Sequence, residues 1–304
     1  MRLGLLTAPF PSTPLLEVAE WSAANGFESL EIACWPMAGG EARRYAGTAH
    51  IDVANLTRGQ ASELVDQIGA HGLAISGLGY YPNPLHPDPA HRERVISHLR
   101  QVIVAAELMN VPLVNTFMGG DATKNQDQNW DDALRIWPEI VAFAADHGRQ
   151  ITIENCPMLF SNDEWPGGHN LATNPRIWRR ILEHWGATIG LNFDPSHLVL
   201  QMIDMPRFIR EFGPHILHVQ AKDLTIDREG LYERGIFSLG IGWQIPRLPG
   251  LGDVDWGVLF AALWRAGYDG DVIIEHEDRT FEKTDDLVKR GFLLARDVLR
   301  PYIK

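Results

Sequence analysis

Short apolar runs alternate along the chain with longer stretches in which apolar residues recur every three or four positions. The short runs have strand length and are rich in Ile, Val and Leu, a composition typical of buried parallel strands. They predict eight strands, at 3–7, 29–33, 74–78, 113–117, 151–154, 189–193, 216–220 and 272–275. The periodic stretches predict eight helices, at 14–25, 58–71, 89–109, 131–147, 175–185, 205–212, 256–266 and 285–299.

Eight strand–helix units in succession predict a closed (β/α)8 TIM barrel that occupies residues 1–304 as a single domain. An open doubly wound sheet would usually have fewer units, and no glycine-rich dinucleotide fingerprint follows the first strand. The helix boundaries agree with this assignment. Asn174 precedes Pro175 in the pattern of a cap followed by proline at the first helical position, and Gly26 and Gly72 stand where two helices would end.

Three predicted connections are long, namely 35–57, 156–174 and 224–254. Each follows the carboxyl end of a strand, so in a barrel each would overhang the mouth where active sites form. Loops of this length in a compact domain are usually functional. A contact between subunits is the alternative interpretation.

Four of the predicted strands end in side chains that commonly bind metal ions. Glu154, Asp194 and Glu275 close the fifth, sixth and eighth strands, and Gln220, with His218 two residues before it, closes the seventh. The carboxyl ends of parallel barrel strands converge at one mouth. Three carboxylates with an amide or an imidazole, converging from four strands, therefore predict a site for one divalent cation.

The alternation of side chains along each strand places these polar groups inside the barrel. On the fifth strand, Thr152 and Glu154 share one face while Ile151 and Ile153 share the other, which suits the helix layer. A carboxylate inside the barrel is unfavourable unless it is paired or metal-bound, and three of them would repel one another strongly without a cation. The alternative is that these carboxylates pair with Arg or Lys.

The ligand on the seventh strand is ambiguous from the residues alone. Gln220 lies roughly 6–7 Å nearer the mouth than His218 by strand rise, so position favours Gln220 while ligand chemistry favours His218. An imidazole would admit cobalt or zinc as well as manganese, whereas an all-oxygen set favours manganese or magnesium. We predict Gln220 as the ligand and His218 as a core residue one layer below. Manganese is then the first candidate ion, with magnesium or cobalt as alternatives.

Composition and charge exclude some classes of function. The chain is 45% hydrophobic and 22% charged, as is ordinary for a globular protein, and its formal net charge of −12 disfavours a nucleic-acid partner. No run of about 18 apolar residues is present, so we expect no membrane span. Cys34 and Cys156 lack a CxxC spacing, and the N-terminus lacks the pattern of a signal peptide. A reducing, cytoplasmic location is the expectation.

Five motifs follow one another in the second half of the chain. They are Ile-Glu-Asn at 153–155, Asn-Phe-Asp-Pro-Ser-His at 192–197, His-Val-Gln-Ala-Lys-Asp at 218–223, Gly-Leu-Gly-Asp-Val-Asp-Trp at 250–256 and Ile-Glu-His-Glu at 274–277. In this order they resemble the xylose-isomerase-like TIM-barrel superfamily, which includes many sugar isomerases and epimerases. The resemblance covers nearly the whole chain. It implies that Glu154, Asp194, the seventh-strand position and Glu275 bind the metal, and that His197 contacts substrate.

Two positions depart from the pattern of the resemblance. Relatives commonly place a histidine where Gln220 stands, just before the Lys-Asp pair. The ketose 3-epimerase branch also carries an arginine about where this chain has Ile226. Both departures argue against a standard ketose 3-epimerase. Relatives that act on 3-oxo sugars and glycosides, including subunits of deglycosylating enzymes, are the competing match.

The leading hypothesis is a metal-dependent sugar isomerase or epimerase that abstracts a proton next to a carbonyl through a metal-stabilised enediolate. Glu154 and Glu275 come from well-separated strands, so they are the candidate acid/base pair, while Asp194 has a structural role. His197 would hydrogen-bond a substrate hydroxyl, or else stabilise its own turn. Lys222 would polarise a carbonyl, or else form a salt bridge with Asp194 or with the neighbouring aspartate.

Sugar rings also need flat apolar surfaces and hydrogen-bonding groups around the mouth. Aromatic residues after the strands or in the mouth loops could supply the surfaces, although each alone is more often a packing residue. Asn155 and the histidine after Glu275 would orient neighbouring ligands. The candidate substrate-binding residues are Trp35, Tyr80, Phe117, Asn155, His169 and Trp243.

Two other functions remain open at this point. The same site could act as a lyase or deglycosidase on 3-oxo-glycosides by β-elimination, alone or with a partner subunit. A barrel that binds sugar without catalysis is the alternative of another class. A DNA-repair endonuclease on a related barrel would need a histidine-rich multi-zinc cluster and is disfavoured by the negative charge. The expected partner is a small carbohydrate, with a homo-oligomer or hetero-oligomer compatible with the sequence.

Overall fold

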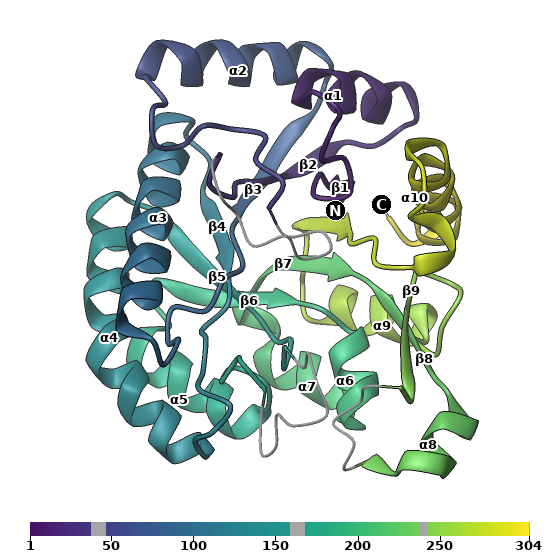
Figure 1. Ribbon diagram of the computed structural model, residues 1–304. Coiled ribbons are helices and arrows are strands. Elements are labelled where there is room, and N and C mark those ends of the chain that lie inside the picture. Colours follow the sequence, from purple (N-terminus) through teal and green to yellow (C-terminus); the bar gives the residue numbers. More distant parts are fainter. Residues whose placement is uncertain (38–46, 159–167, 237–241, 304) are drawn as a thin grey trace.

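Eight parallel strands close into a barrel in the order β1-β10-β7-β6-β5-β4-β3-β2 (Figure 1). The computed structural model describes residues 1–37, 47–158, 168–236 and 242–303. The predicted TIM barrel is therefore confirmed, and the strands begin and end within one residue of their predicted bounds. They are β1 (Arg2–Leu6), β2 (Ser29–Ala33), β3 (Ala74–Gly79), β4 (Leu113–Thr116), β5 (Gln150–Glu154), β6 (Ile189–Phe193), β7 (Ile216–Ala221) and β10 (Asp271–Ile274).

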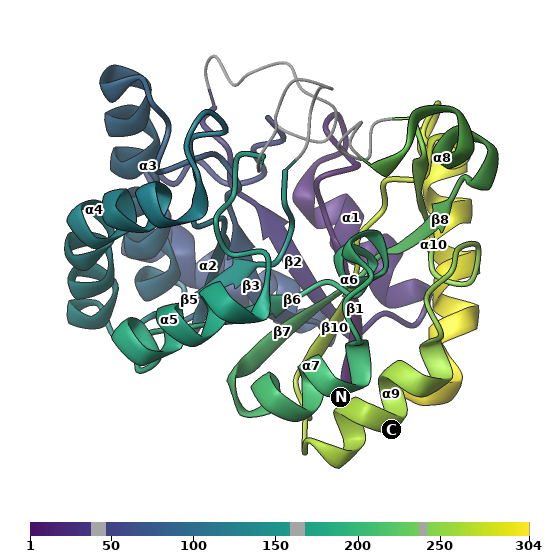
Figure 2. The same cartoon turned by 90° about the horizontal axis from the view of Figure 1, so that it is seen from below.

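Helices surround the barrel on its outer side (Figure 2). All eight predicted helices are present: α5, α7 and α10 match the prediction, and α1, α2, α3 and α9 differ from it by one residue at one or both ends. They are α1 (Leu15–Ala24), α2 (Arg58–Ala70), α3 (Pro89–Leu108), α4 (Gln126–Asp146), α5 (Pro175–Trp185), α7 (Met205–Phe212), α9 (Trp256–Arg265) and α10 (Asp285–Leu299). Among the described residues, none of the helices is both long and apolar enough to cross a membrane.

Helix α4 begins five residues earlier than predicted, at Gln126 rather than 131. A capping box explains the difference. The Asn125 side chain accepts from the Gln128 backbone N–H at 2.9 Å, and the Gln128 side chain accepts from the Asn125 N–H at 3.0 Å. This reciprocal pair satisfies two backbone donors at the helix start. The polar first turn carries no apolar periodicity, which is why the pattern of the sequence did not include it.

Four elements that the sequence pattern missed lie in the connections after β6 and β7. Helix α6 (Ser196–Gln201) follows β6, while β8 (Asp223–Ile226) and β9 (Gln244–Arg247) form an antiparallel pair with α8 (Arg228–Arg234) between them. The long connection after β7 is thus partly regular structure. Leu224, Trp243 and Leu200 of α6 form a small apolar cluster of their own. Residues 38–46, 159–167 and 237–241 of the three long connections lie outside the described residues.

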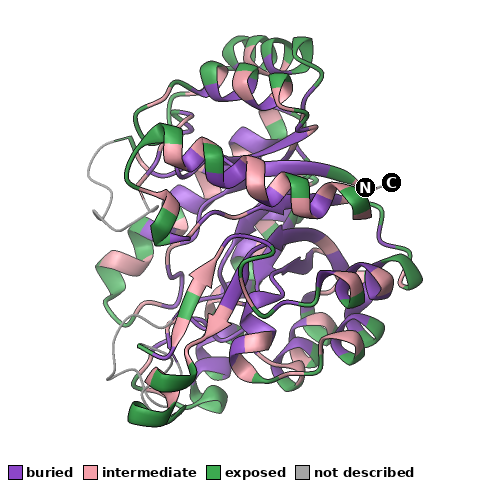
Figure 3. Cartoon of the chain, turned by 90° about the vertical axis from the view of Figure 1, so that its right-hand side faces the viewer, coloured by how far each residue is buried: buried purple, intermediate pink, exposed green. Residues whose placement is uncertain are grey.

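The barrel interior is polar and almost fully buried, as the strand alternation predicted. Thr152 Oγ1 donates to Asn115 Oδ1 at 2.5 Å across β5 and β4, in the manner of buried polar groups that satisfy one another. Apolar strand residues such as Ile151 and Ile153 are fully buried in the main hydrophobic core. Figure 3 shows the same division, with the strands buried and the outer helix surfaces exposed.

Candidate active site

Three carboxylates meet at the carboxyl ends of the strands. Glu154 is the last residue of β5, Asp194 follows β6, and Glu275 follows β10, where its backbone N–H donates to Ala221 O of β7 at 3.2 Å. One oxygen from each carboxylate lies within 4.8 Å of the other two. Glu154 and Asp194 are buried, and the Glu275 side chain is 13% exposed. The structure therefore brings together the three carboxylates that the sequence singled out.

Asn155 locks two of these strand ends together. Its Oδ1 accepts from the Asp194 backbone N–H, and its Nδ2 donates to the Asp194 carbonyl, both at 2.8 Å. Both amide atoms are thus engaged with the main chain beyond β6. Asn155 positions Asp194 relative to Glu154, and the sequence-based expectation that it orients a neighbouring ligand has a direct geometric counterpart.

The ammonium of Lys222 lies among the carboxylates. Its Nζ is 3.0 Å from both Asp194 Oδ2 and Glu275 Oε2, 3.3 Å from Glu277 Oε2 and 3.9 Å from Glu154 Oε1. The side chain is only 4% exposed. The structure thus contains both arrangements considered from the sequence: a three-carboxylate cluster, and a lysine in the barrel mouth that neutralises it.

Asp223, the neighbour of Lys222, accepts hydrogen bonds from the main chain and from an indole. Its Oδ1 accepts from the backbone N–H groups of Leu224 and Val254, and its Oδ2 accepts from the N–H of Gly250 and from Trp256 Nε1, at 2.8 to 3.0 Å. One fully buried carboxylate therefore ties the 250–256 segment to the end of β7. This explains the Gly-Leu-Gly-Asp-Val-Asp-Trp motif, and it leaves Lys222 without Asp223 as its salt-bridge partner.

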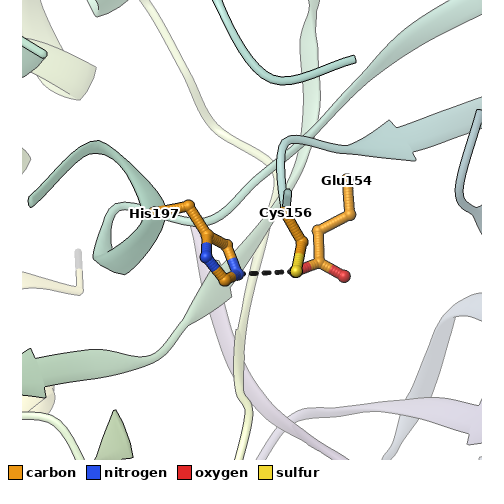
Figure 4. Close-up of side chains that lie close together, drawn as sticks. All are labelled: Glu154, Cys156 and His197. Atoms are coloured by element: carbon orange, nitrogen blue, oxygen red, sulfur yellow. Dashed lines mark hydrogen bonds and ion pairs between the residues drawn. The ribbon is translucent and has the colours of Figure 1, made fainter. Parts of the chain in front are cut away.

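His197 stands in the first turn of α6 and faces two of the carboxylates. Its Nε2 is 3.0 Å from Asp194 Oδ2 and 3.1 Å from Glu154 Oε1. Asp194 Oδ1 accepts from the Ser196 backbone N–H at 2.8 Å, so the same aspartate that meets the imidazole also contacts the first residue of the helix carrying it. Figure 4 shows Cys156 beside this contact, and no sequence argument had assigned Cys156 to the site.

The electrostatic environment shifts the pKa values of the three carboxylates in different directions. Burial raises the pKa of Glu275 well above its usual value, although Lys222 opposes this, and burial likewise raises the pKa of Glu154. Burial would also raise the pKa of Asp194, but Lys222 and His197 outweigh it and hold that pKa far below the ordinary range. The pKa values of Glu154 and Glu275 are therefore shifted upward and that of Asp194 is shifted downward.

Gln220 contacts a carboxylate that the sequence analysis overlooked. Its Nε2 donates to Glu31 Oε2 at 3.0 Å and to Tyr81 Oη at 2.8 Å, and Tyr81 Oη in turn donates to Glu31 Oε1. Glu31 is fully buried in the middle of β2. A glutamate inside the apolar run at 29–33, on the inward face, was the available signal. The contact directs the amide nitrogen of Gln220 toward Glu31 and leaves the buried Oε1 without a hydrogen-bond partner.

His218 lies one layer below Gln220 with both ring nitrogens in contact with polar side chains. Its Nδ1 is 2.8 Å from Asn192 Oδ1, and its Nε2 is 3.1 Å from Ser76 Oγ. Burial lowers its pKa, so the imidazole is neutral in the interior. The two potential metal-binding groups of the described residues do not contain His218.

The described residues fit a divalent cation. Three convergent carboxylates supply an oxygen-donor set, which suits manganese or magnesium. Glu154, Asp194 and Glu275 could hold the ion. Because Lys222 shares two of these carboxylates closely, a cation bound here would compete with its ammonium.

Most of the predicted sugar-binding aromatic residues are buried in one cluster. Ring centroids of Trp35 and Tyr80, and of Trp35 and Tyr81, are 6.0 Å apart, and those of Tyr81 and Phe117 are 5.1 Å apart. Through Tyr81 the cluster reaches Glu31 and supports the polar layer of the barrel. Trp243 lies elsewhere, in the small apolar cluster over α6.

A cavity of about 540 Å³ lies over α6, and none of the three carboxylates lines it. Leu200, Met202 and Trp243 supply apolar lining, and Gln201 and Asn170 supply amides. Two lining residues connect the cavity to the carboxylates and His197. Gln201 Nε2 donates to the backbone carbonyl of His197 at 3.0 Å, and Asn170 Nδ2 donates to the backbone carbonyl of Glu154 at 2.9 Å. The predicted residue His169 precedes Asn170, and its N–H donates to the carbonyl of residue 158 at 3.2 Å.

This chain is similar in sequence and in fold to known proteins. A family model described as Xylose isomerase-like TIM barrel matches residues 19–298. The uncharacterized protein YfiH of Bacillus subtilis (strain 168) is 24% identical over 305 residues, covering 92% of this chain and 94% of that protein. Among solved structures, D-psicose 3-epimerase from Clostridium cellulolyticum H10, determined with D-tagatose, has a TM-score of 0.72 at 17% identity, with both chains covered completely.

A second solved structure widens the range of chemistry found on this fold. The 3-keto-D-glucoside 4-epimerase YcjR from E. coli, in its apo form, has a TM-score of 0.65 at 14% identity, covering 98% of this chain and 99% of that chain. At such identities the structural likeness shows a shared fold. Which reaction the site performs has to be argued from its own residues.

Proposed function

We propose that this chain, which belongs to the xylose isomerase-like TIM-barrel family, is a metal-dependent sugar isomerase or epimerase that abstracts a proton next to a carbonyl. One observation carries the proposal: Glu154, Asp194 and Glu275 converge at the barrel mouth, where burial raises the pKa of Glu154 and of Glu275 while Lys222 and His197 lower the pKa of Asp194. A pair of proton-exchanging groups beside a fixed negative charge is what reversible proton transfer requires.

In this proposal Glu154, Asp194, Glu275 and the Oε1 atom of Gln220 hold one divalent cation, with manganese as the first candidate and magnesium or cobalt as alternatives. When bound, such an ion lowers the free energy of a negatively charged enediolate by drawing charge from its oxygens. Lys222 retains Glu277, 3.3 Å from its Nζ, as a partner when the other carboxylates turn to the ion.

Glu154 and Glu275 are the proposed acid/base pair. Strands β6 and β7 separate β5 from β10 in the barrel, so the two carboxylates approach a bound sugar from different directions. One would take the proton from the carbon next to the carbonyl, and the other would return a proton to the product. Lys222 would donate a hydrogen bond to the carbonyl oxygen, and His197 would donate one to a neighbouring hydroxyl.

The decisive first measurement is metal content per chain by elemental analysis, on protein purified without chelator. We expect about one manganese, magnesium or cobalt per chain, lost in Glu154→Gln and kept in Glu139→Gln, which removes an exposed carboxylate on α4. Absence of metal from the unaltered chain, even after reloading with manganese, would refute the mechanism and favour a barrel that binds sugar without catalysis.

Proton abstraction has its own signature. In D2O a ketose substrate should acquire one deuterium at the carbon next to the carbonyl, and Glu275→Gln should retain the folded barrel while losing this exchange. Full turnover by a metal-loaded Glu275→Gln variant would show that the acid/base assignment is wrong.

The cavity over α6 favours a second candidate function, β-elimination from a 3-oxo-glycoside by this chain alone or with a partner subunit. A substrate whose sugar ring lies at the carboxylates could extend its leaving group along α6 into the space lined by Leu200, Gln201 and Trp243. Ile226, where the resemblance to ketose 3-epimerases would require arginine, is consistent with this alternative. Product analysis with 3-oxo-glucosides and with free ketoses separates the two: released aglycone supports the lyase, and a new ketose supports the isomerase.

A further inference from the structure

We propose that Glu154, Cys156 and His197 form a binding site for a thiophilic divalent cation such as zinc, next to the oxygen-donor site and sharing Glu154 with it. The site does not depend on which reaction the barrel performs. It is argued from three side chains that converge from the end of β5 and the start of α6.

The ligand atoms lie close to the spacing that one ion needs. The Glu154 carboxylate, the Cys156 Sγ and a ring nitrogen of His197 lie within 4.8 Å of one another, and His197 Nε2 is 3.1 Å from Glu154 Oε1. With zinc–ligand distances of about 2.0–2.3 Å, two ligands of a tetrahedral ion lie roughly 3.5 Å apart. Figure 4 shows the carboxylate and the thiol directed toward the imidazole, so small side-chain rotations would complete the site.

The segment that carries two of the ligands is held in place by one side chain. Asn170 Nδ2 donates to the backbone carbonyls of Glu154 at 2.9 Å and of Cys156 at 2.7 Å. Asn170 Oδ1 accepts from the Gly119 N–H at 3.2 Å, which anchors the amide itself. The carboxylate and the thiol are therefore presented together on a fixed main chain, which is how outer contacts orient metal ligands.

The sulfur also has a backbone hydrogen bond. The Met158 N–H donates to Cys156 Sγ at 3.3 Å, and Met158 has a φ of +52°, in the left-handed region that a methionine rarely occupies. The turn thus aims a main-chain donor at the sulfur. Such a donor stabilises the negative charge of a metal-bound thiolate.

The donor set separates this site from the oxygen-donor site. Thiolate and imidazole favour zinc or cobalt, whereas the carboxylates with Gln220 favour manganese or magnesium. Three protein ligands would leave one position of a tetrahedral ion open. Lys222 Nζ, 3.9 Å from Glu154 Oε1 and close to Asp194 and Glu275, already offsets the charge of the oxygen-donor site. A thiophilic ion can therefore bind at Cys156 without displacing the ammonium.

Cobalt(II) provides the spectroscopic test, because thiolate-bound cobalt has a sulfur-to-metal charge-transfer band in the near ultraviolet. Titrating the full chain with cobalt should produce this band to saturation near one equivalent, and zinc should abolish it by displacement. Cys156→Ser should lose the band, whereas Cys34→Ala, which removes the other cysteine, buried after β2, should keep it. A band that is absent from the unaltered chain, or that persists in Cys156→Ser, would overturn the proposal.

A second measurement needs no variant and so remains decisive if Cys156→Ser folds poorly. Zinc at one equivalent should slow alkylation of Cys156 by iodoacetamide at least tenfold, as followed by mass spectrometry, while manganese should leave the rate unchanged. Equal rates with and without zinc would refute the site. Manganese content measured on Cys156→Ser tests the oxygen-donor site separately, since that site contains no sulfur and should keep its manganese.

Discussion

The Nζ atom of Lys222 lies 3.0 Å from Oδ2 of Asp194, inside the group of carboxylates that would bind a cation. The ammonium and a divalent ion therefore serve the same electrostatic purpose, which is to neutralise buried negative charge. A lysine in this place keeps the barrel mouth stable without metal. Its ammonium would also compete with a divalent ion for these carboxylates, and this competition can be measured.

Replacing Lys222 by methionine should expose that competition. Loss of a buried charge partner typically costs about 3–5 kcal/mol, so Lys222→Met without metal should have a clearly lower melting temperature. Manganese should then raise the melting temperature of Lys222→Met by more than it raises that of the unaltered chain, because the ion no longer competes with an ammonium. Thermal unfolding with and without manganese checks this.

The matched control is Lys283→Met, which removes an exposed lysine before α10. It should change neither the melting temperature without metal nor the rise that manganese produces. An unchanged melting temperature for Lys222→Met would mean that its ammonium does not stabilise the carboxylates.

The pH dependence of turnover should report Glu275. Because burial raises its pKa, activity that needs the ionised carboxylate should fall on the acid side at a pH above the ordinary value of 4.5. Glu277 raises the pKa of Glu275 further by charge repulsion. Glu277→Gln should therefore lower that pKa and move the acid limb of kcat/KM to lower pH. A limb that stays in place or moves to higher pH would contradict the assignment of Glu275 as the base.

Asp223→Ala should be among the most destabilising single changes in the mouth. It removes the acceptor for three backbone N–H groups and one indole N–H, and an unsatisfied buried donor costs about 1–3 kcal/mol. We expect the free energy of unfolding in urea to fall by about 3 kcal/mol or more. Asp253→Ala, which removes one acceptor contact with the Ile226 N–H in the same segment, is the control and should have a much smaller effect.

Acid should destabilise the fold through its buried histidines. Burial lowers the pKa of His50 and His98, whose Nε2 atoms lie 3.1 Å and 2.8 Å from the backbone carbonyls of Phe10 and Cys34. Because the unfolded chain takes up these two protons at a higher pH than the folded chain does, the contribution of His50 and His98 to stability is constant above the ordinary pKa of 6.5 and falls as pH drops below it.

The melting temperature measured between pH 7 and pH 5 checks this expectation. His98→Gln should fall less steeply over that interval, whereas replacement of the exposed His71 by glutamine should leave the slope unchanged. A melting temperature that rises toward pH 5 would contradict the sign.

The cavity beside α6 makes a prediction about substrate size. If it receives the leaving group of a glycoside, Trp243→Ala should raise KM for glycosides about tenfold, corresponding to ~1.4 kcal/mol of binding, and leave KM for a free ketose unchanged. Trp264→Ala, at a half-exposed tryptophan of α9, is the control. Equal increases for both substrates would show that Trp243 acts on the fold and not on the glycoside.

The barrel and its helices could be predicted from the sequence because the signals are local. Apolar runs mark strands and periodic stretches mark helices, so the strand and helix order needs no knowledge of distant contacts. The start of α4 and the whole of α6 were not predicted, because a polar capping sequence and a six-residue helix show no apolar periodicity. The β8–β9 pair depends on residues twenty positions apart, which no local pattern links.

The sequence by itself determined that Glu154, Asp194 and Glu275 lie at one mouth, because the carboxyl ends of parallel strands converge and alternation along a strand sets the face of each side chain. Only the tertiary structure decided which inward groups meet. Glu31 engages Gln220 across the barrel, and His197 comes within reach of Cys156. The physical reason is that strand parity specifies a direction, whereas contacts depend on strand register and on turns such as the one at Met158.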